Sequence, residues 1–101
     1  MTEITVRRAV AGDRSELARL AALDSATPPR GPALVAEADS RMLAALPLGS
    51  GRPIADPFEP TAAVVALLEL RAEQIAARRA EHGWSERVRS LLRPRPSHAR
   101  A

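Results

Sequence analysis

The stretch that decides the fold runs Ile54-Ala55-Asp56-Pro57-Phe58-Glu59-Pro60-Thr61-Ala62-Ala63 and leads directly into Val64-Val65-Ala66-Leu67-Leu68-Glu69-Leu70-Arg71. Residues 53–56 form a short apolar segment bracketed by prolines, which indicates a strand, and the residues after Pro60 have the apolar spacing of a helix. A strand that runs straight into a helix often presents the helix N-terminus to a phosphate group. Here the connecting loop has no glycine, one backbone donor is missing at a proline, and Glu59 brings negative charge. The sequence therefore combines the architecture of an anion site with residues that oppose an anion.

The segments before this junction predict three further strands. Residues 4–7 alternate apolar and polar side chains, which is typical of a half-buried strand. Residues 33–46 have apolar runs on both sides of the turn Asp39-Ser40-Arg41, which indicates a β-hairpin. Because proline cannot donate to a sheet ladder, we expect the fourth strand, over residues 53–56, at an edge of the sheet.

A first helix is predicted over about residues 14–24. Asp13 is a favourable N-cap, and Glu16 three residues later completes a capping-box-like pair. Residues 27–32 contain three prolines and must form a loop between this helix and the hairpin.

The long helix after the junction is predicted to run through about residue 79. Its apolar face is centred on Leu68, and twenty residues would span roughly 30 Å across the sheet. Glu81-His82-Gly83 is expected to end this helix, and Ser85 is expected to cap a short final one.

Together these elements predict an α/β (α+β) fold with a four-stranded, mainly antiparallel sheet and two or three helices. Residues 1–80 are predicted to form the domain, residues 81–94 a short basic amphipathic helix, and residues 95–101 a disordered tail. A chain of 101 residues with 46% apolar residues is large enough for one modest core.

The composition excludes several classes of site. The chain has no cysteine, which rules out disulfides, thiolate nucleophiles and cysteine-ligated metals. No apolar run approaches the roughly 20 residues that span a bilayer, and the first residues lack the pattern of a secretory signal. A cytoplasmic location is therefore expected.

Three passages resemble the N-terminal half of the GNAT acetyltransferase superfamily. Ile4-Thr5-Val6-Arg7-Arg8-Ala9-Val10-Ala11-Gly12-Asp13 is similar to the opening strand and helix cap of that family. Leu34-Val35-Ala36-Glu37-Ala38-Asp39-Ser40-Arg41-Met42-Leu43-Ala44-Ala45-Leu46 resembles its second and third strands, where an Asp-Gly turn is usual. Ile54-Ala55-Asp56-Pro57, followed by Ala66-Leu67-Leu68-Glu69, is similar to the fourth strand and the cofactor helix. The resemblance covers about residues 3–79 and is to a truncated or degenerate GNAT domain.

The resemblance also implies that cofactor binding has been lost. In the family, the loop after the fourth strand reads Arg/Gln-x-x-Gly-x-Gly/Ala, and its backbone N–H groups hold the pyrophosphate of acetyl-CoA. The corresponding loop here is Phe58, Glu59, Pro60, Thr61, Ala62 and Ala63, which lacks glycine and one donor. Glu59 would occupy the place where the helix dipole favours an anion, so no cofactor is expected. The family's later strands have no counterpart.

No catalytic residue and no metal site are predicted. The polar residues that could carry chemistry each have a simpler structural explanation as strand, turn or helix residues: Glu37, Asp39, Asp56, His82, Ser85 and His98. Ser85 has no histidine or acid at motif spacing, and the two histidines are too far apart in the sequence to indicate a metal site.

The C-terminal end is basic and amphipathic. Residues 1–77 hold eight arginines and ten acidic residues, whereas residues 78–101 hold seven arginines and two acidic residues. A candidate partner-binding surface there comprises Trp84, Arg87, Arg89 and Arg93. Because Trp84, Val88 and Leu91 recur at i, i+4 and i+7, we expect this stripe to be buried within the protein or its dimer. No further aromatic residues are interleaved to stack bases, which argues against single-stranded nucleic acid.

The sequence favours a small non-catalytic GNAT-like protein that acts as an interaction or regulatory module. Its partner would be a second copy that covers an exposed face of the sheet, or an unidentified protein. One alternative is an acyl-CoA-dependent N-acyltransferase or acyl-CoA sensor whose site is completed by a partner chain. Another is an accessory protein that binds an acidic partner or a membrane through its basic C-terminal helix.

Overall fold

The computed structural model describes residues 3–92 and contains a four-stranded antiparallel sheet with two α-helices, which confirms the predicted fold class. The strands follow the order of the sequence across the sheet, β1-β2-β3-β4. The elements are β1 (Thr5–Arg8), a 3-10 turn η1 (Ala11–Asp13), α1 (Arg14–Leu23), β2 (Ala33–Ala38), β3 (Arg41–Pro47), β4 (Ile54–Ala55) and α2 (Ala62–Leu92).

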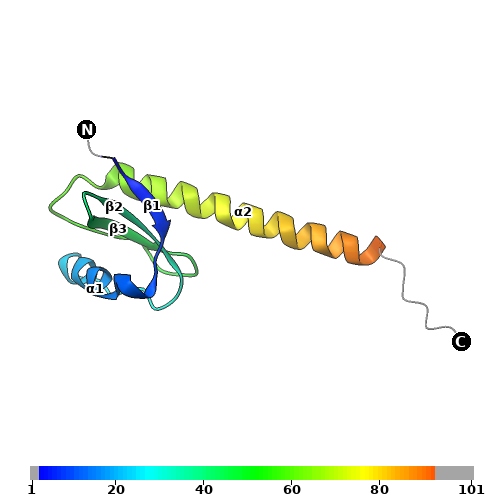
Figure 1. The fold of residues 1–101 in the computed structure, drawn as a ribbon, viewed down its shortest axis with the longest axis horizontal. Coiled ribbons are helices and arrows are strands. Elements are labelled where there is room, and N and C mark those ends of the chain that lie inside the picture. The colour runs from blue at the N-terminus through cyan, green and yellow to red at the C-terminus, as the bar shows by residue number, and fades with distance from the viewer. Residues whose placement is uncertain (1–2, 93–101) are drawn as a thin grey trace, which may run out of the picture.

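The sheet lies between the two helices (Figure 1). Leu17 and Leu20 of α1 pack with Val35 on one face. Val64 and Leu68 of α2 pack against the other face, and Leu68 is fully buried, as its place at the centre of the apolar face predicts. The expectation that a second copy covers an exposed sheet face is wrong, because α1 and α2 already bury both faces of β2 and β3.

A β-bulge at Leu43 aligns β3 with β4. Ala36 pairs with Ala44 and Glu37 pairs with Met42, so Leu43 is the extra residue on β3. Its carbonyl oxygen accepts a hydrogen bond from the backbone N–H of Asp56, at 2.9 Å. The bulge thus extends the contact between the strands to the residue where the chain turns toward α2.

The fourth strand lies at an edge of the sheet, as its prolines predict, and its outer side is capped. The backbone N–H of Ala55 donates to Oδ2 of Asp24, which follows α1, at 3.1 Å. A side-chain acceptor on an edge N–H blocks the pairing of a further strand at that point.

The predicted break at residues 81–83 is wrong, because α2 is one helix of 31 residues. Glycine ends a helix most readily where the backbone needs a positive φ, and Gly51 is the one glycine with a positive φ among the described residues. Within a helix, Gly83 costs only about 1 kcal/mol relative to alanine, and no proline interrupts residues 62–92. The separate final helix capped by Ser85 is therefore absent, and Ser85 lies inside α2.

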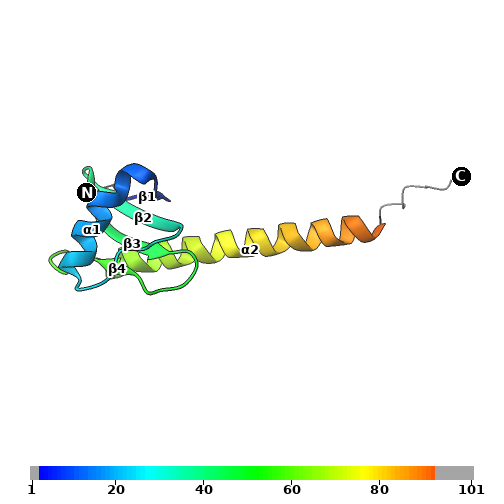
Figure 2. The ribbon, with the colours of Figure 1, turned by 90° about the horizontal axis from the view of Figure 1, so that it is seen from below.

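The distal half of α2 projects away from the sheet (Figure 2), and the molecule measures 70 × 26 × 21 Å. The last α2 side chain that packs on the core is Ile75. Trp84 is 64% exposed, so it is not buried within a single copy, and its burial in a dimer stays a prediction. The physical reason for this exposure is the length of the helix, because the two- to seven-residue strands end long before a helix of roughly 46 Å does. The predicted tail over residues 95–101 lies outside the described residues.

Candidate functional site

The loop that joins β4 to α2 is organised by Asp56. Its side-chain Oδ1 accepts from the backbone N–H of Phe58 at 2.8 Å, and its carbonyl oxygen accepts from the N–H of Glu59 at 3.4 Å. Asp56 is only 1% exposed, which agrees with the turn role predicted for it. Phe58 points outward and is 80% exposed. The first helical hydrogen bond follows at once, from Val65 N–H to the Thr61 carbonyl oxygen at 2.8 Å.

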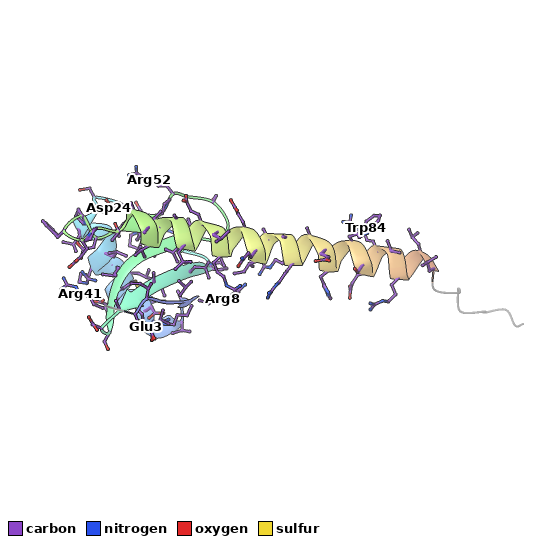
Figure 3. The ribbon with its side chains drawn as sticks, turned by 90° about the horizontal axis from the view of Figure 1, so that it is seen from above. Glu3, Arg8, Asp24, Arg41, Arg52 and Trp84 are labelled. Atoms are coloured by element: carbon purple, nitrogen blue, oxygen red, sulfur yellow. The ribbon has the colours of Figure 1, made fainter. Side chains whose placement is uncertain are left out.

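A cavity of about 530 Å³ lies beside this loop, at the start of α2. It brings together the first strand, the hairpin turn, the bulge and the helix start, and it is lined by Ile4, Ala38, Asp39, Arg41, Leu43, Glu59, Pro60 and Val64. Its charged lining consists of the carboxylates of Asp39 and Glu59 and the guanidinium of Arg41. Figure 3 shows Arg41 at the end of the molecule where α2 begins.

The chemistry of this cavity is unfavourable for a pyrophosphate. Two carboxylates outnumber the single guanidinium of Arg41, and Pro60 has no N–H to offer at the helix start. Glu59 and Pro60 thus lie just before the N-terminus of α2. This is the end of the helix where the dipole favours an anion such as a cofactor phosphate.

Glu37, one of the carboxylates considered as a base, is held by Arg7. Nε of Arg7 donates to Oε1 of Glu37 at 2.9 Å, and Nη1 and Nη2 of Arg7 donate to the two carboxylate oxygens of Asp13, each at 2.8 Å. These hydrogen bonds to the two carboxylates, chiefly to Asp13 and next to Glu37, raise the pKa of Arg7 above its ordinary value. The same guanidinium, with the N–H of Val10, lowers the pKa of Asp13 to about 2. This Arg7–Asp13–Glu37 cluster ties β1, η1 and β2 together through ion pairs.

Asp13 and Glu16 therefore do not form the predicted capping box. Asp13 stands at the N-cap position of α1 without a side-chain cap, because its carboxylate binds Arg7 and the N–H of Val10. Glu16 instead accepts from Nε of Arg19 at 2.9 Å and from the backbone N–H of Met42 at 3.3 Å. The hydrogen bond from Arg19 is the main cause that lowers the pKa of Glu16. Both carboxylates thus join α1 to the sheet.

The remaining candidates lie apart from one another. Asp39 is exposed in the hairpin turn, and Ser85 is exposed on α2. His82 lies 3.6 Å from Glu86 one turn along α2, an exposed pair that is ionic only when the histidine is protonated. Within residues 3–92 no three histidine, aspartate or glutamate side chains gather to hold a metal ion, and His98 lies outside the described residues.

The exposed apolar side chains gather on α2. Among the described residues, seven large apolar side chains are exposed, and five of them belong to this helix: Leu67, Leu70, Trp84, Leu91 and Leu92. Arg87 and Arg89 of the predicted partner surface are exposed on the same half of α2 as Trp84, while Arg93 lies outside the described residues. Figure 3 shows Trp84 on the distal half of α2, far from the sheet.

Sequence reasoning missed two parts of this arrangement. The Arg7–Asp13–Glu37 cluster has no local signature, because its members come from segments up to 30 residues apart. The extent of the exposed stripe does have a signature in the sequence. Once α2 is taken as one helix, an apolar or small residue recurs every seven residues, at Leu70, Ala77, Trp84 and Leu91.

Comparisons of this chain with protein-family models, with curated proteins and with solved structures found no match. Among the helices in residues 3–92, none combines the length and the apolar character needed to cross a membrane.

Proposed function

We propose that this chain is a small non-catalytic, GNAT-like protein that acts as an interaction or regulatory module, with the projecting part of α2 as its docking arm. One observation carries the proposal: α2 continues for 17 residues beyond Ile75, its last residue packed on the core, and bears exposed apolar side chains there. A surface helix with an apolar stripe that nothing covers is typical of a segment that binds a partner.

The GNAT-like part of the proposal is supported by the order of the elements. A strand, a helix, an antiparallel meander and a long helix follow one another along the chain, in the order expected from the resemblance. The non-catalytic part is supported by the loop that begins α2, where Glu59 and Pro60 oppose an anion. Two further acidic groups, Asp13 and Glu37, are engaged by Arg7.

The experiment is calorimetry of the full chain with coenzyme A at millimolar concentration. We expect no saturable heat. A dissociation constant below roughly 10 μM, about −7 kcal/mol, would overturn the non-catalytic assignment. Glu59→Gln keeps the shape of the loop and removes its charge, so it reports whether any weak affinity is limited by this carboxylate. Glu69→Gln, on an exposed position of α2 outside the cavity, is the control and should behave as the unmodified chain.

The alternative of an acyl-CoA site completed by a partner chain draws on the cavity of about 530 Å³ at the start of α2. A partner strand would add at β4, the edge next to that loop. Asp24 already binds the outward N–H of Ala55, and prolines flank the strand, so the edge is poorly suited to such an addition.

The alternative of an acidic or membrane partner draws on the charge of the distal half of α2. Residues 78–92 hold four arginines and two glutamates. Trp84 is the single tryptophan of the chain and is exposed, so its emission reports directly on contact with anionic vesicles. A blue shift that saturates with anionic but not with neutral vesicles would favour this alternative over the interaction module.

A further inference from the structure

The outward face of α2 carries two interleaved rows of residues with a seven-residue repeat. At 100° per residue, the row that contains Leu70 and Trp84 lies on the side of the helix turned away from Val64 and Leu68, the two residues it buries against the sheet. The other row flanks that side, and Leu67 at its start lies about 60° around the helix from Val64. One row consists of Leu70, Ala77, Trp84 and Leu91, and the other, three residues earlier in each repeat, of Leu67, Gln74, Glu81 and Val88. We call these eight residues the α2 seam. Two such rows, three and four residues apart, are the pattern of a helix that packs along another helix.

The seam is apolar at its two ends and polar or small in its middle. Leu67 and Leu70 lie at the proximal end, where α2 covers the sheet, and are 43% and 51% exposed. Trp84 and Leu91, at 64% and 85% exposed, lie at the projecting end. Gln74, Ala77 and Glu81 separate the two ends. A lipid surface favours a continuous apolar face, and this seam is interrupted at its centre.

We propose that α2 pairs with α2 of a second copy of this chain, antiparallel, along the α2 seam. This proposal rests on the proposed function, because it names the partner of the docking arm. In the antiparallel register that overlaps residues 67–91 fully, Leu67 faces Leu91 of the second copy and Leu70 faces Val88 of the second copy. Each apolar end thereby covers the apolar end of the other copy, and the overlap is roughly 36 Å long.

The polar residues of the seam distinguish antiparallel from parallel pairing. In a parallel pair in register, each seam residue faces its own copy, so Glu81 would face Glu81 in the interior of the pair. In the antiparallel register Glu81 faces Ala77 of the second copy, and Gln74 faces Trp84. The repulsion between two desolvated carboxylates is thereby removed.

Charge complementarity also favours the antiparallel pair. Within α2, residues 62–77 hold two glutamates and one arginine, whereas residues 78–92 hold four arginines and two glutamates. Antiparallel pairing lays the basic projecting half of one helix along the acidic domain end of the other. At the flank of the seam it places Glu73 opposite Arg87 of the second copy. Arg78 faces its own copy near the centre, where a long side chain can extend into water.

Sedimentation equilibrium of the full chain tests the proposal. We expect a dimer of about 22 kDa, twice the 10.8 kDa of the chain. Its dissociation constant should be at most roughly 100 μM, which corresponds to a binding free energy of about −5.5 kcal/mol. Leu91→Glu should raise the dimer dissociation constant at least roughly tenfold, since it places a charge in the seam. Ser90→Glu is the matched control: it adds the same charge one residue away, off the seam, and should leave the dimer intact. Circular dichroism of both variants checks that they fold.

The orientation is tested by crosslinking, because the chain has no cysteine of its own. A mixture of the Leu67→Cys and Leu91→Cys variants should form a disulfide-linked heterodimer on mild oxidation, whereas each variant alone should not. Homodimer crosslinks of each variant alone would mean a parallel pair and would overturn the antiparallel arrangement. A monomer at every concentration would overturn the pairing and leave the absence of coenzyme A binding untouched. Saturable coenzyme A binding by a dimer would contradict the non-catalytic function and leave the pairing standing.

Discussion

At the scale of single residues, three non-glycine residues within residues 3–92 adopt a positive φ: Ser25, Asp39 and Ser40. Asp39 and Ser40 form the two-residue turn of the β2–β3 hairpin, for which left-handed residues are required. Ser25 follows the C-cap of α1. Its N–H donates to the carbonyl oxygen of Ala22 at 3.3 Å, and the N–H of Ala26 donates to that of Ala21 at 2.8 Å. This is the hydrogen-bond pattern of a Schellman motif, in which glycine is the preferred residue at this place.

Ser25→Gly should therefore stabilise the domain. A left-handed non-glycine residue costs roughly 1–2 kcal/mol, and glycine loses about 0.4–1 kcal/mol through the greater freedom of the unfolded chain. We expect the free energy of unfolding in urea to rise by about 0.5–1 kcal/mol. Ser15→Gly, at an exposed position inside α1, is the control and should lower it by about 0.5 kcal/mol. A loss of stability in Ser25→Gly would contradict the left-handed conformation.

The carboxylate of Asp13 should make stability depend on pH in the acid range. Its pKa is about 2 in the folded protein and 3.8 ordinarily, because Arg7 and the N–H of Val10 bind the charged form. Because the pKa of this carboxyl is lower in the folded than in the unfolded state, its ionised form stabilises the folded protein by about 2 kcal/mol. This stabilisation is fully present above about pH 4 and is lost as the pH falls toward 2. Urea unfolding at several pH values should show this loss, and Asp13→Asn should be less stable at pH 7 and flatter between pH 4 and 2. An acid profile of Asp13→Asn identical to that of the unmodified chain would contradict the pairing with Arg7, and Glu69→Gln is the exposed control.

At the scale of elements, α2 has two different halves. Val64 and Leu68 are buried against the sheet, while the helix beyond Ile75 has no core contact. The apolar face that packs on the sheet turns polar at the same point, where Arg79, His82 and Glu86 continue it. An isolated helix is marginal in water, so the distal half depends on propagation from the anchored proximal half.

Leu68→Ala should strongly destabilise the domain, because Leu68 is fully buried between α2 and the sheet. Removal of a buried leucine side chain usually costs about 2–5 kcal/mol. Urea unfolding would measure this loss. Glu69→Ala, the adjacent exposed position, should change the stability by no more than about 0.5 kcal/mol. Equal stability of the two variants would mean that another face of α2 packs on the sheet.

Gly83→Ala tests the continuity of α2. A Cβ added at Gly83 meets no atom within 4 Å, and alanine is favoured over glycine inside a helix by about 1 kcal/mol. Ellipticity at 222 nm should therefore become more negative. Gly51→Ala is the contrasting variant: there φ is +121° and the new Cβ would lie 3.2 Å from Cγ of Pro47, so stability should fall. A decrease in helicity in Gly83→Ala would indicate a helix break at this residue.

At the scale of the whole molecule, the chain consists of a small α/β domain with a helical arm, and its extents of 70 × 26 × 21 Å reflect the arm. Ile75 is the last α2 residue that packs on the core of the domain. The arm carries Trp84 and Leu91 into solvent, away from the core of the single copy.

A chain that ends at Arg79 should therefore fold with nearly unchanged stability. The appropriate reference is the monomeric Leu91→Glu variant, since this comparison leaves out any stabilisation from pairing. We expect the free energies of unfolding of the two proteins in urea to agree within about 0.5 kcal/mol. The urea midpoint of the shortened chain should be independent of protein concentration. A markedly lower midpoint of the shortened chain would mean that residues beyond 79 pack on their own domain.

The sequence by itself determined the elements of the domain and the character of its central loop. Alternation along residues 4–7, the hairpin turn at Asp39 and Ser40, and prolines that confine β4 to an edge are local signals, because backbone geometry and donor loss act within a few residues. The burial of Leu68 followed from helical periodicity for the same reason.

Only the tertiary structure decided the partners of the polar groups and the place where α2 leaves the sheet. Asp13 met every local criterion of a helix cap, yet its carboxylate binds Arg7, which sits on the adjacent strand and offers a charged donor. The exposure of Trp84 depends on the length of strands that lie at least 29 residues earlier in the sequence, as does the exposure of every side chain beyond Ile75. An apolar stripe in the sequence shows that a helix has a face to cover, but the size of the folded sheet decides how much of that face is left for a partner.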